Sequence, residues 1–330
     1  MYIIATVGVN TKDSNVLLQM INSGVNVIRL NTAHGNKEEF NNILNIVRGY
    51  NNGIHILQDL SGSKIRVSDR IKDVIRIFDK EEVLFCGEDI YRDSKLRKVI
   101  PLNINNNLLT SNNIERISMK DNTMKFRIKK KDNSGILAEV IKGGVVRGGK
   151  GCNIKGIKRN NILSIKDKGD LRWAINNNID IICQSFVEKK EDINNVKLYI
   201  QNNSSNYKPK IWAKVESSRG INNIHEIAES CDGIVVGRGD LIPETSLTST
   251  PYLQERVINK AKDMKIDIIL ATHILDSMKN GRDPDLPEVE SIYNNIKKGV
   301  NGFLLAGETS VGKRPINTVK FLNTLIGRYI

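Results

Sequence analysis

The chain has 330 residues, of which 39% are hydrophobic, and a formal net charge of +13. That composition is sufficient for a buried core and too apolar for a disordered chain. Its basic residues are scattered, its aromatic residues are sparse, and it has no zinc-finger spacing, which argues against nucleic-acid binding. With no signal peptide and no apolar run of membrane-spanning length, we expect a cytoplasmic protein that binds neither nucleic acid nor membrane.

The cysteines and histidines are isolated from one another. The four cysteines form no CxxC pair, and the four histidines show no metal-ligand spacing. We therefore expect buried, free thiols in a reducing compartment and no histidine metal site.

Short apolar segments alternate with helical patterns near the amino terminus. Strands are predicted over 2–8, 26–31 and 54–59, with a helix over 14–21. A second helix carries apolar residues at helical spacing over 40–47, and Asn36 and Glu39 are placed to form a capping box at its start.

Residues 68–157 have a different character. They contain β-rich, charged pieces such as "KDVIRIF" and "MKFRIKKK" and show no helical period. We interpret them as a small all-β lid domain inserted in a strand-to-helix loop, because loops tolerate insertions best. The larger domain would then comprise residues 1–67 and 158–330.

The alternation resumes after residue 160. Strands are predicted over 180–186, 210–216, 232–240, 267–272 and 302–308, with helices over 190–201, 223–229 and 252–264 and from Pro287 and Pro315 onward. Eight β/α units predict a TIM barrel, with an open doubly wound sheet as the alternative. The barrel is favoured because polar residues recur at the carboxyl ends of the strands, which meet at one mouth of a barrel.

These strand-end residues suggest a chemistry. They are Arg29, Asn31, Asp59, Arg66, Lys214, Glu216, Arg238, Gly239, Asp240, Thr272 and Glu308. Glu216 and Asp240 follow adjacent strands and would suit Mg²⁺, which prefers oxygen ligands. Lys214 and Glu216 are two residues apart on one strand and so share a face. Lys214, Arg29 and Arg66 would supply positive charge for a phosphoryl group.

Each of these residues also has a purely structural explanation. Lys214 and Glu216 could form an ordinary ion pair, and Thr272 could be a satisfied hydroxyl at the barrel rim. Their shared position at the strand ends favours function, because TIM barrels carry their chemistry there.

Several segments, in chain order, resemble motifs of the pyruvate kinase family. "NVIRLNTAHG" is similar to its RLNFSHG segment, "ILQDLSGSKIRV" to LDTKGPEIRT, and "AKVESSRGINNIHEI" to SKIENxEGxxNxDEI. "DGIVVGRGDL", "ATHILDSM" and "LLAGETSVGKRP" resemble DGIMVARGDL, ATQMLESM and MLSGETAKGxYP. The resemblance covers the whole chain and implies Mg²⁺-dependent (or Mn²⁺-dependent) phosphoryl transfer from phosphoenolpyruvate to ADP, giving pyruvate and ATP.

The resemblance assigns the substrate residues. Lys214 and Arg29 would neutralise the transferring phosphoryl group, and Glu216 and Asp240 would bind the metal. Thr272, with the backbone at Gly239 and Asp240, would hold the substrate carboxylate and lie near the carbon that is protonated.

It also assigns the nucleotide side of the site. Asn31, His34 and Arg66 would lie there, and Lys150 matches a lid lysine that closes over the nucleotide phosphates.

The sequence departs from the family pattern at the monovalent-cation site. The residues there are Asn31, Ala33, Asp59 and Leu60, so two oxygen ligands of the family pattern are missing. Lys64 stands where K⁺-dependent members carry glutamate. This combination resembles the K⁺-independent branch, in which a fixed ammonium replaces the ion, and we expect that K⁺ is not required.

Other departures concern the nucleotide edge and a subunit contact. "PDLPE" (284–288) replaces PTRAE, "VGVN" replaces IGPA, and "GDLIPE" lacks the glycine of GDLG. The chain also ends after the eighth predicted helix, without the family's carboxy-terminal domain. We therefore expect a monomer or homodimer without sugar-phosphate regulation.

Two other functions remain open at this stage. One is a metal-dependent lyase or aldolase acting on a 2-oxo acid, which would share the carboxylate pair and an enolate intermediate. The other is a non-catalytic phosphoenolpyruvate-binding relative. Retention of Lys214, Lys150 and a lid argues against the lyase, which needs neither a phosphoryl clamp nor a nucleotide cover.

Overall fold

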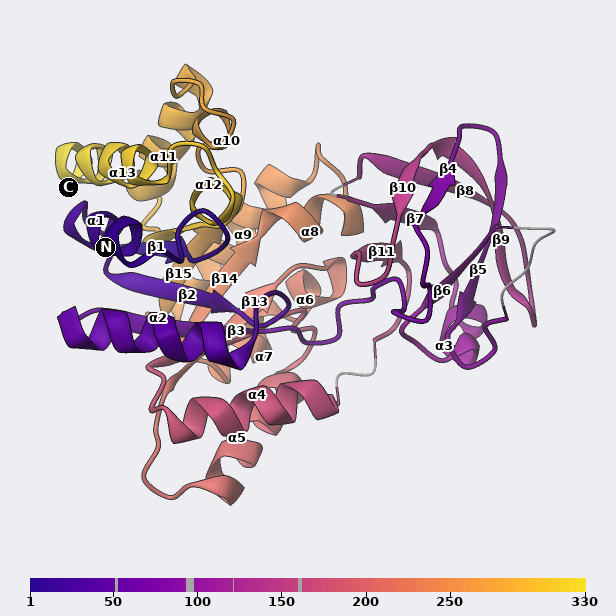
Figure 1. Ribbon diagram of the computed structural model, residues 1–330, viewed down its shortest axis with the longest axis horizontal. Helices are drawn as coiled ribbons and strands as arrows, with labels where there is room; N and C mark the ends of the chain where they lie inside the picture. Colours follow the sequence, from indigo (N-terminus) through magenta and orange to yellow (C-terminus); the bar gives the residue numbers. More distant parts are fainter. Residues whose placement is uncertain (51–52, 93–97, 121, 160–161) are drawn as a thin grey trace. The chain divides into compact units, whose positions relative to one another are not determined.

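The computed structural model describes residues 1–50, 53–92, 98–120, 122–159 and 162–330 (Figure 1). The chain divides into two compact units. The larger unit comprises Met1–Gly62, Asn161–Gly239 and Pro251–Ile330, and the smaller unit comprises Ser63–Asn160 and Asp240–Thr250.

The larger unit is built on a closed barrel of parallel strands. They are β1 (Tyr2–Thr6), β2 (Val27–Asn31), β3 (His55–Leu60), β12 (Ile181–Gln184), β13 (Lys210–Val215), β14 (Gly233–Gly237), β15 (Asp267–Ala271) and β16 (Gly302–Leu305). They follow one another around the barrel in the order β1-β16-β15-β14-β13-β12-β3-β2. The predicted TIM barrel is confirmed, and the open sheet is excluded because β1 pairs with both β2 and β16.

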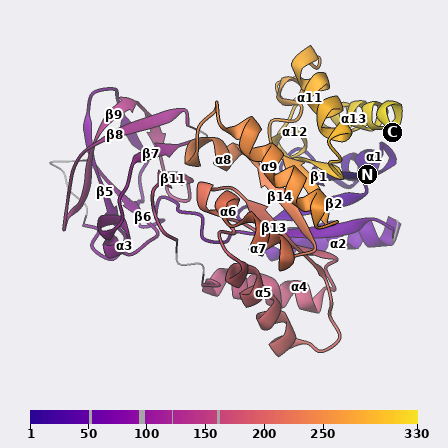
Figure 2. The ribbon, with the colours of Figure 1, turned by 180° about the vertical axis from the view of Figure 1, so that it is seen from behind.

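Helices connect successive barrel strands (Figures 1 and 2). They are α1 (Ser14–Asn22), α2 (Lys37–Tyr50), α4 (Ile165–Asn176), α5 (Lys190–Asn203), α6 (Ser218–Asn222), α7 (Ile224–Glu229), α8 (Arg238–Glu244), α9 (Thr250–Asp263), α10 (Asp276–Lys279), α11 (Leu286–Lys297), α12 (Gly307–Ser310) and α13 (Pro315–Tyr329). The backbone N–H of Glu39 donates to the Asn36 side chain at 2.9 Å, which caps the start of α2 as expected.

The barrel interior is filled by apolar side chains below the strand ends. This core comprises Ile4, Val27, Leu57, Ile181, Cys183, Trp212, Val235, Ile269, Ala271 and Leu304. Trp212 is fully buried, and Gly233 on the neighbouring strand leaves room for it, since a Cβ there would lie 2.7 Å from the indole nitrogen. The packed interior confines polar chemistry to the ends of the barrel.

The smaller unit is mostly β-structure. Its strands are β4 (Ile75–Ile77), β5 (Glu82–Gly87), β6 (Lys98–Leu102), β7 (Arg116–Met119), β8 (Met124–Asp132), β9 (Gly135–Lys142), β10 (Gly144–Val146) and β11 (Cys152–Lys155). Six form a sheet in the order β11-β7-β8-β9-β5-β6, and β10 pairs with β4. Phe85 and Phe126 pack edge to face in its core, with ring centroids 4.9 Å apart.

The smaller unit contains one helix that the sequence reading missed. This helix, α3 (Asn106–Ser111), is capped by the side chain of Asn105, which accepts from the backbone N–H of Asn107 at 2.9 Å. It is too short for its apolar residues to give a helical period, so only the Asn cap marked it in the sequence.

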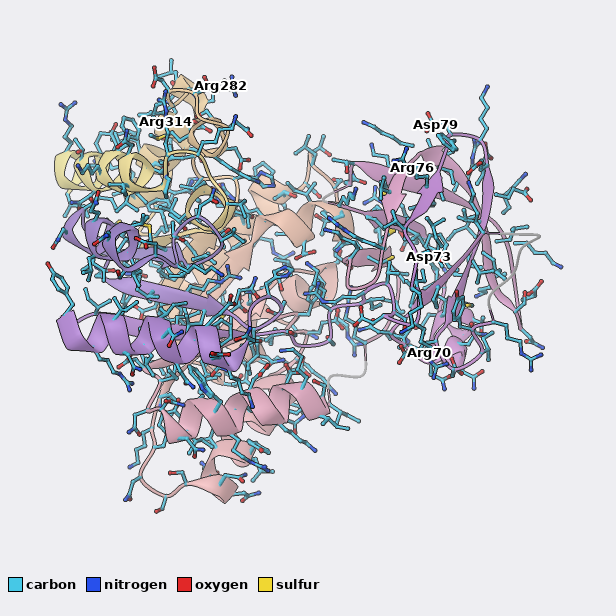
Figure 3. All side chains as sticks on the ribbon, viewed as in Figure 1. Arg70, Asp73, Arg76, Asp79, Arg282 and Arg314 are labelled. Atoms are coloured by element: carbon cyan, nitrogen blue, oxygen red, sulfur yellow. The ribbon has the colours of Figure 1, made fainter. Side chains whose placement is uncertain are left out.

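Both units carry charged side chains. Figure 3 labels Arg70, Asp73, Arg76 and Asp79 on the smaller unit and Arg282 and Arg314 on the larger. Arg314, for example, lies 2.9 Å from an oxygen of Asp283. All four cysteines are buried and free. Among the described residues, no helix has the length and apolar character needed to cross a membrane.

Candidate active site

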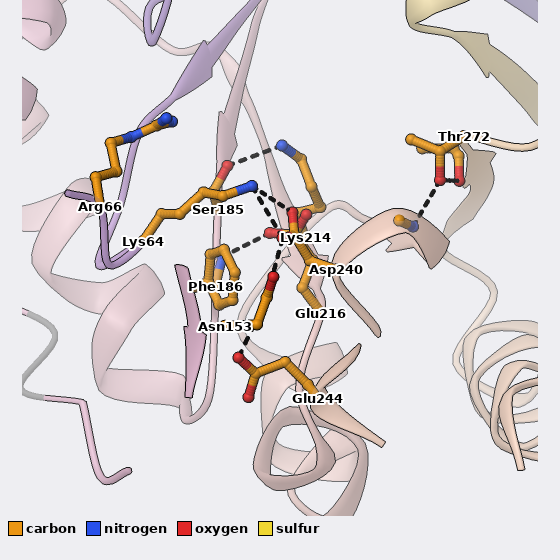
Figure 4. Close-up of polar contacts among 12 residues, drawn as sticks. Lys64, Arg66, Asn153, Ser185, Phe186, Lys214, Glu216, Asp240, Glu244 and Thr272 are labelled. Carbon is orange, nitrogen blue, oxygen red and sulfur yellow. Dashed lines mark hydrogen bonds and ion pairs between the residues drawn. The ribbon is translucent and has the colours of Figure 1, made fainter. Parts of the chain in front are cut away.

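A cluster of buried charges lies at the carboxyl ends of β2, β3 and β13. The Lys214 amino group lies 2.6 Å from each carboxylate oxygen of Asp59 and donates to the Ser185 hydroxyl at 2.8 Å. Figure 4 shows the contact between Lys214 and Ser185. Arg29 donates to Asp59 through both Nε, at 2.8 Å, and Nη2. One carboxylate therefore binds two cations.

Burial and charge act on this cluster in opposite directions. Asp59 is 1% exposed and Lys214 is 7% exposed. Burial alone would raise the pKa of Asp59, but Lys214 and Arg29 outweigh it and lower that pKa to about 2. Burial works against the charged form of Lys214, yet Asp59 and Glu216 raise its pKa overall. Asp59 and Lys214 are therefore both charged at neutral pH.

Glu216 follows the last residue of β13 and is also buried. One of its carboxylate oxygens accepts the backbone N–H of Phe186 at 3.1 Å (Figure 4). Gly237, at the end of β14, makes room for this side chain, because a Cβ there would lie 2.5 Å from a carboxylate oxygen of Glu216. The lack of a side chain at Gly237, on the next strand, therefore allows the Glu216 carboxylate to take this position.

Thr272 follows the last residue of β15. Its hydroxyl accepts the backbone N–H of Gly239 at 2.8 Å and donates to the carbonyl of Ala271 at 2.5 Å (Figure 4). The predicted juxtaposition of Thr272 with the Gly239 backbone is thus present within the larger unit.

Several predicted strands end earlier than expected, and two of them end three residues early. The strand predicted over 232–240 ends at Gly237, and Arg238, Gly239 and Asp240 form the first turn of α8. The change follows from the residues, because the β-branched run stops there and Arg-Gly-Asp has no apolar alternation. The strand predicted over 302–308 ends at Leu305.

Glu308 consequently lies in α12 rather than on a strand, and it is 1% exposed. Its carboxylate accepts the backbone N–H groups of Ala306, Ile274 and Leu275 at 2.8, 3.2 and 3.4 Å. These contacts tie together the loops that follow β15 and β16.

Asn31 and His34 lie in the loop that follows β2. The Asn31 side chain accepts the backbone N–H of Ala33 at 3.1 Å, and the His34 backbone N–H donates to the Asn31 carbonyl at 3.0 Å. His34 itself is exposed. Asn31 therefore shapes the turn that follows β2.

The remaining predicted site residues belong to the smaller unit. The Lys64 amino group lies 2.9 and 2.7 Å from the two carboxylate oxygens of Asp240 (Figure 4). Asn153 donates to Asp240 at 3.1 Å and to Glu244 at 3.4 Å. Arg159 lies 2.6 Å from Glu244, and this ion pair is almost completely buried.

Arg66 and Lys150 lie on neighbouring segments of the smaller unit. Arg66 Nη1 donates to the Gly149 carbonyl at 2.9 Å, and the Arg66 backbone bridges to Gly151. Burial lowers the pKa of Lys150, and the positive charges of Arg147, Lys120 and Arg66 lower it further. These neighbouring positive charges repel one another, and a bound anion would relieve that repulsion.

Two of the predicted carboxylates, Glu216 in the larger unit and Asp240 in the smaller, have the ligand type that Mg²⁺ and Mn²⁺ take. Within the described parts of the chain, no group of three His, Cys, Asp or Glu residues could hold an ion by itself.

Several residues of the site escaped the sequence reading. Asp59 was noted at a strand end and as a remnant of the monovalent-cation site, but not as the partner of Lys214. Ser185, Asn153, Glu244 and Arg159 were not selected at all. The available signal was Asp59 itself, an acid at the end of the buried run "HILQD", which requires a cation nearby.

Comparison with known proteins identifies the family of this chain. Residues 1–319 match the family model described as pyruvate kinase, barrel domain. The chain is 29% identical to a pyruvate kinase of Staphylococcus epidermidis and to one of Geobacillus stearothermophilus, each over 98% of this chain and 56% of the relative. It is 28% identical to a pyruvate kinase of Clostridium perfringens, over 98% of this chain and 68% of the relative.

The chain thus spans little more than half the length of most of these relatives, and the match falls on their barrel domain. The family model, the closed parallel barrel and the inserted β-rich segment agree with one another. The chain belongs to the pyruvate kinase family.

Proposed function

We propose that this protein transfers the phosphoryl group of phosphoenolpyruvate to ADP and releases pyruvate and ATP. The observation that carries the proposal is the buried cluster of Arg29, Asp59 and Lys214, in which one carboxylate holds two cations at the carboxyl end of the barrel. Phosphoryl transfer depends on positioning and on neutralising charge on the equatorial oxygens, and fixed buried cations serve that purpose.

The roles of the larger unit follow from its contacts. Asp59 and Ser185 hold the Lys214 ammonium in place, so that it meets the incoming phosphoryl group without reorganisation. Arg29 is held by Asp59 and Thr6 and presents its guanidinium to the same group. Thr272 and the Gly239 backbone receive the substrate carboxylate, with Thr272 close to the carbon that takes up a proton.

Glu216 and Asp240 are the proposed metal ligands. A divalent ion held by these residues would supply positive charge to the reacting oxygens. The Phe186 backbone N–H already orients the Glu216 carboxylate, and Asp240 would exchange part of its contact with Lys64 for the ion.

Four of the predicted residues are assigned to the nucleotide. We propose that Arg66 and Lys150 bind phosphate oxygens, with Asn31 and His34 in the barrel loop that faces the nucleotide. We also propose that the smaller unit acts as a lid domain. Lys64 replaces the monovalent cation, so that K⁺ is not required, and the protein is a monomer or a homodimer.

A coupled assay tests the proposal. Pyruvate release from phosphoenolpyruvate is measured with ADP, with GDP and without acceptor, for wild type, Lys214→Met and Lys210→Met. Lys210 is the matched control because it begins the same strand but is half exposed and pairs with Asp267 at 3.2 Å. We expect Lys214→Met to lose roughly 10²- to 10³-fold in kcat, the cost typical of losing a transition-state donor.

The same assay separates the alternatives. Cleavage of a 2-oxo acid to pyruvate, with neither phosphoenolpyruvate nor a nucleoside diphosphate present, would favour the lyase. Mg²⁺-dependent binding of phosphoenolpyruvate without turnover on any acceptor would favour the non-catalytic relative. Equal rates for Lys214→Met and Lys210→Met would refute the role given to Lys214.

A further inference from the structure

The turn that carries Thr272 has an unusual backbone. Thr272 and His273 are consecutive and both have positive φ angles, 67° and 52°. L-residues with side chains rarely adopt this left-handed region, and for a β-branched residue such as threonine it is a genuine outlier. Such a conformation costs of order 1–3 kcal/mol per residue and persists only where surrounding contacts hold it.

The side chain of Arg238 donates hydrogen bonds to the backbone carbonyls of both strained residues. Arg238 donates to the Thr272 carbonyl through Nε at 3.0 Å and Nη2 at 2.5 Å, and its Nη2 also donates to the His273 carbonyl at 2.6 Å. These three contacts use the planar fork of the guanidinium, which a lysine ammonium cannot reproduce.

A buried carboxylate binds the backbone amide groups that follow the turn. Glu308 accepts the backbone N–H groups of Ile274 and Leu275, as described above. Burial lowers the pKa of Arg238 to about 10, while Glu308 and Asp276 favour its charged form. Arg238 is therefore charged at neutral pH and lies in the field of the carboxylate that holds the other end of the turn.

Arg238 is also adjacent in sequence to the residue that Thr272 binds. The backbone N–H of Gly239 donates to the Thr272 hydroxyl at 2.8 Å. The first two residues of α8 thus fix both the backbone and the hydroxyl of Thr272, one through its side chain and the other through its main chain.

We infer that Arg238 is a positioning residue that holds the strained Thr272–His273 turn and thereby sets the Thr272 hydroxyl for the reaction. This inference rests on the proposed function, because the role of Thr272 in the reaction does. Arg238 itself has its donors directed at the turn and acts through Thr272.

A double-mutant cycle tests the inference. The variants are Arg238→Met, Thr272→Ala and the two combined, with Arg282→Met as an exposed arginine control. We expect Arg238→Met to lower kcat about 100-fold, since small misplacements at a reacting centre have effects of that size. Because Arg238 acts through Thr272, the combined variant should be no slower than Thr272→Ala, whereas independent roles would multiply the two losses.

Relief of strain provides a second readout. His273→Asn replaces the second residue of the turn by one that tolerates positive φ. In the Arg238→Met background this change should restore part of the lost rate, about 5-fold or more, while in wild type it should leave the rate nearly unchanged. A loss of rate in Arg238→Met with no rescue would contradict the inference.

Hydrogen exchange at the Gly239 amide reports the positioning independently of turnover. We expect exchange at this amide to be at least 10-fold faster in Arg238→Met than in wild type or Arg282→Met, because its acceptor is no longer held. If wild type makes no ATP, the proposed function fails, and the exchange rate still decides whether Arg238 holds the turn. Unchanged exchange, or multiplicative losses in the cycle, would overturn the inference.

Discussion

Lys64 and Asp240 form a two-pronged ion pair in which one ammonium contacts both oxygens of the carboxylate, at 2.9 and 2.7 Å. The two side chains are mostly buried, with 22% and 14% of their surface exposed. Asp240 is one of the proposed metal ligands, so a permanent positive charge already lies beside that carboxylate.

The first prediction concerns monovalent cations. We expect the wild-type rate in KCl and in NaCl at equal ionic strength to agree within about 2-fold, because the Lys64 charge is tethered rather than diffusible. Lys64→Gln should lower kcat/KM at least 10-fold and regain part of it when K⁺ is added. A many-fold activation of the wild type by K⁺ in steady-state assays would contradict the role of Lys64.

The second prediction concerns the stability of the buried cluster. Asp59→Asn leaves Lys214 and Arg29 buried without their carboxylate, so it should lower the free energy of unfolding by about 3–5 kcal/mol, as breaking a buried pair does. Urea unfolding measures the change. The control is Asp283→Asn, an exposed partner of Arg314, which should cost less than about 1 kcal/mol. Similar losses for the two variants would exclude this account.

The third prediction concerns acid. The pKa of Asp59 is lowered from 3.8 to about 2 in the folded protein. A lowered carboxylate pKa contributes stability above the unfolded pKa, and that contribution disappears as pH falls from about 4 to about 2. The unfolding free energies of wild type and Asp59→Asn should therefore converge across this window by about 2–3 kcal/mol. A constant difference would refute the assignment.

The fourth prediction concerns the buried pair of the smaller unit. Arg159→Met leaves Glu244 buried without its partner and should destabilise by about 3–5 kcal/mol, whereas Arg159→Met combined with Glu244→Gln should recover part of that loss. Arg127→Met is the control, since Arg127 lies 3.3 Å from Glu139 with 65% of its side chain exposed. Denaturant unfolding of the four proteins gives the comparison, and an equal cost for Arg159→Met and Arg127→Met would count against the buried pair.

The barrel could be predicted from sequence because its strands are short apolar runs between helical patterns. Parallel barrel strands are buried on both faces, which makes such runs conspicuous. The ends predicted for β14 and β16 lie too far toward the carboxyl terminus. A polar residue such as Arg238 or Glu308 can end a strand or begin a helix, and the local sequence does not distinguish the two. The short helix α3 is beyond the reach of a periodicity argument.

Which site residues contact one another was harder to predict than which residues belong to the site. Lys214 and Glu216 share a strand face by their spacing, which suggested that they act as a pair. In the barrel, β12 lies between β13 and β3, and Lys214 hydrogen bonds to Ser185, just beyond β12, and to Asp59 of β3. That choice depends on the strand order and on the depth of each side chain, and neither can be read from one segment.

The shared carboxylate of Asp59 has a consequence for how this protein can diverge. Removing Asp59 would leave two buried cations without their carboxylate, and removing either cation would leave that carboxylate with a single charged partner, so folding favours retention of these residues even where catalysis does not. A descendant that lost its activity would retain Arg29, Asp59 and Lys214 long after it had given up Thr272. In such a lineage, the presence of Thr272 would indicate that activity is retained, whereas the presence of the trio would indicate only common descent.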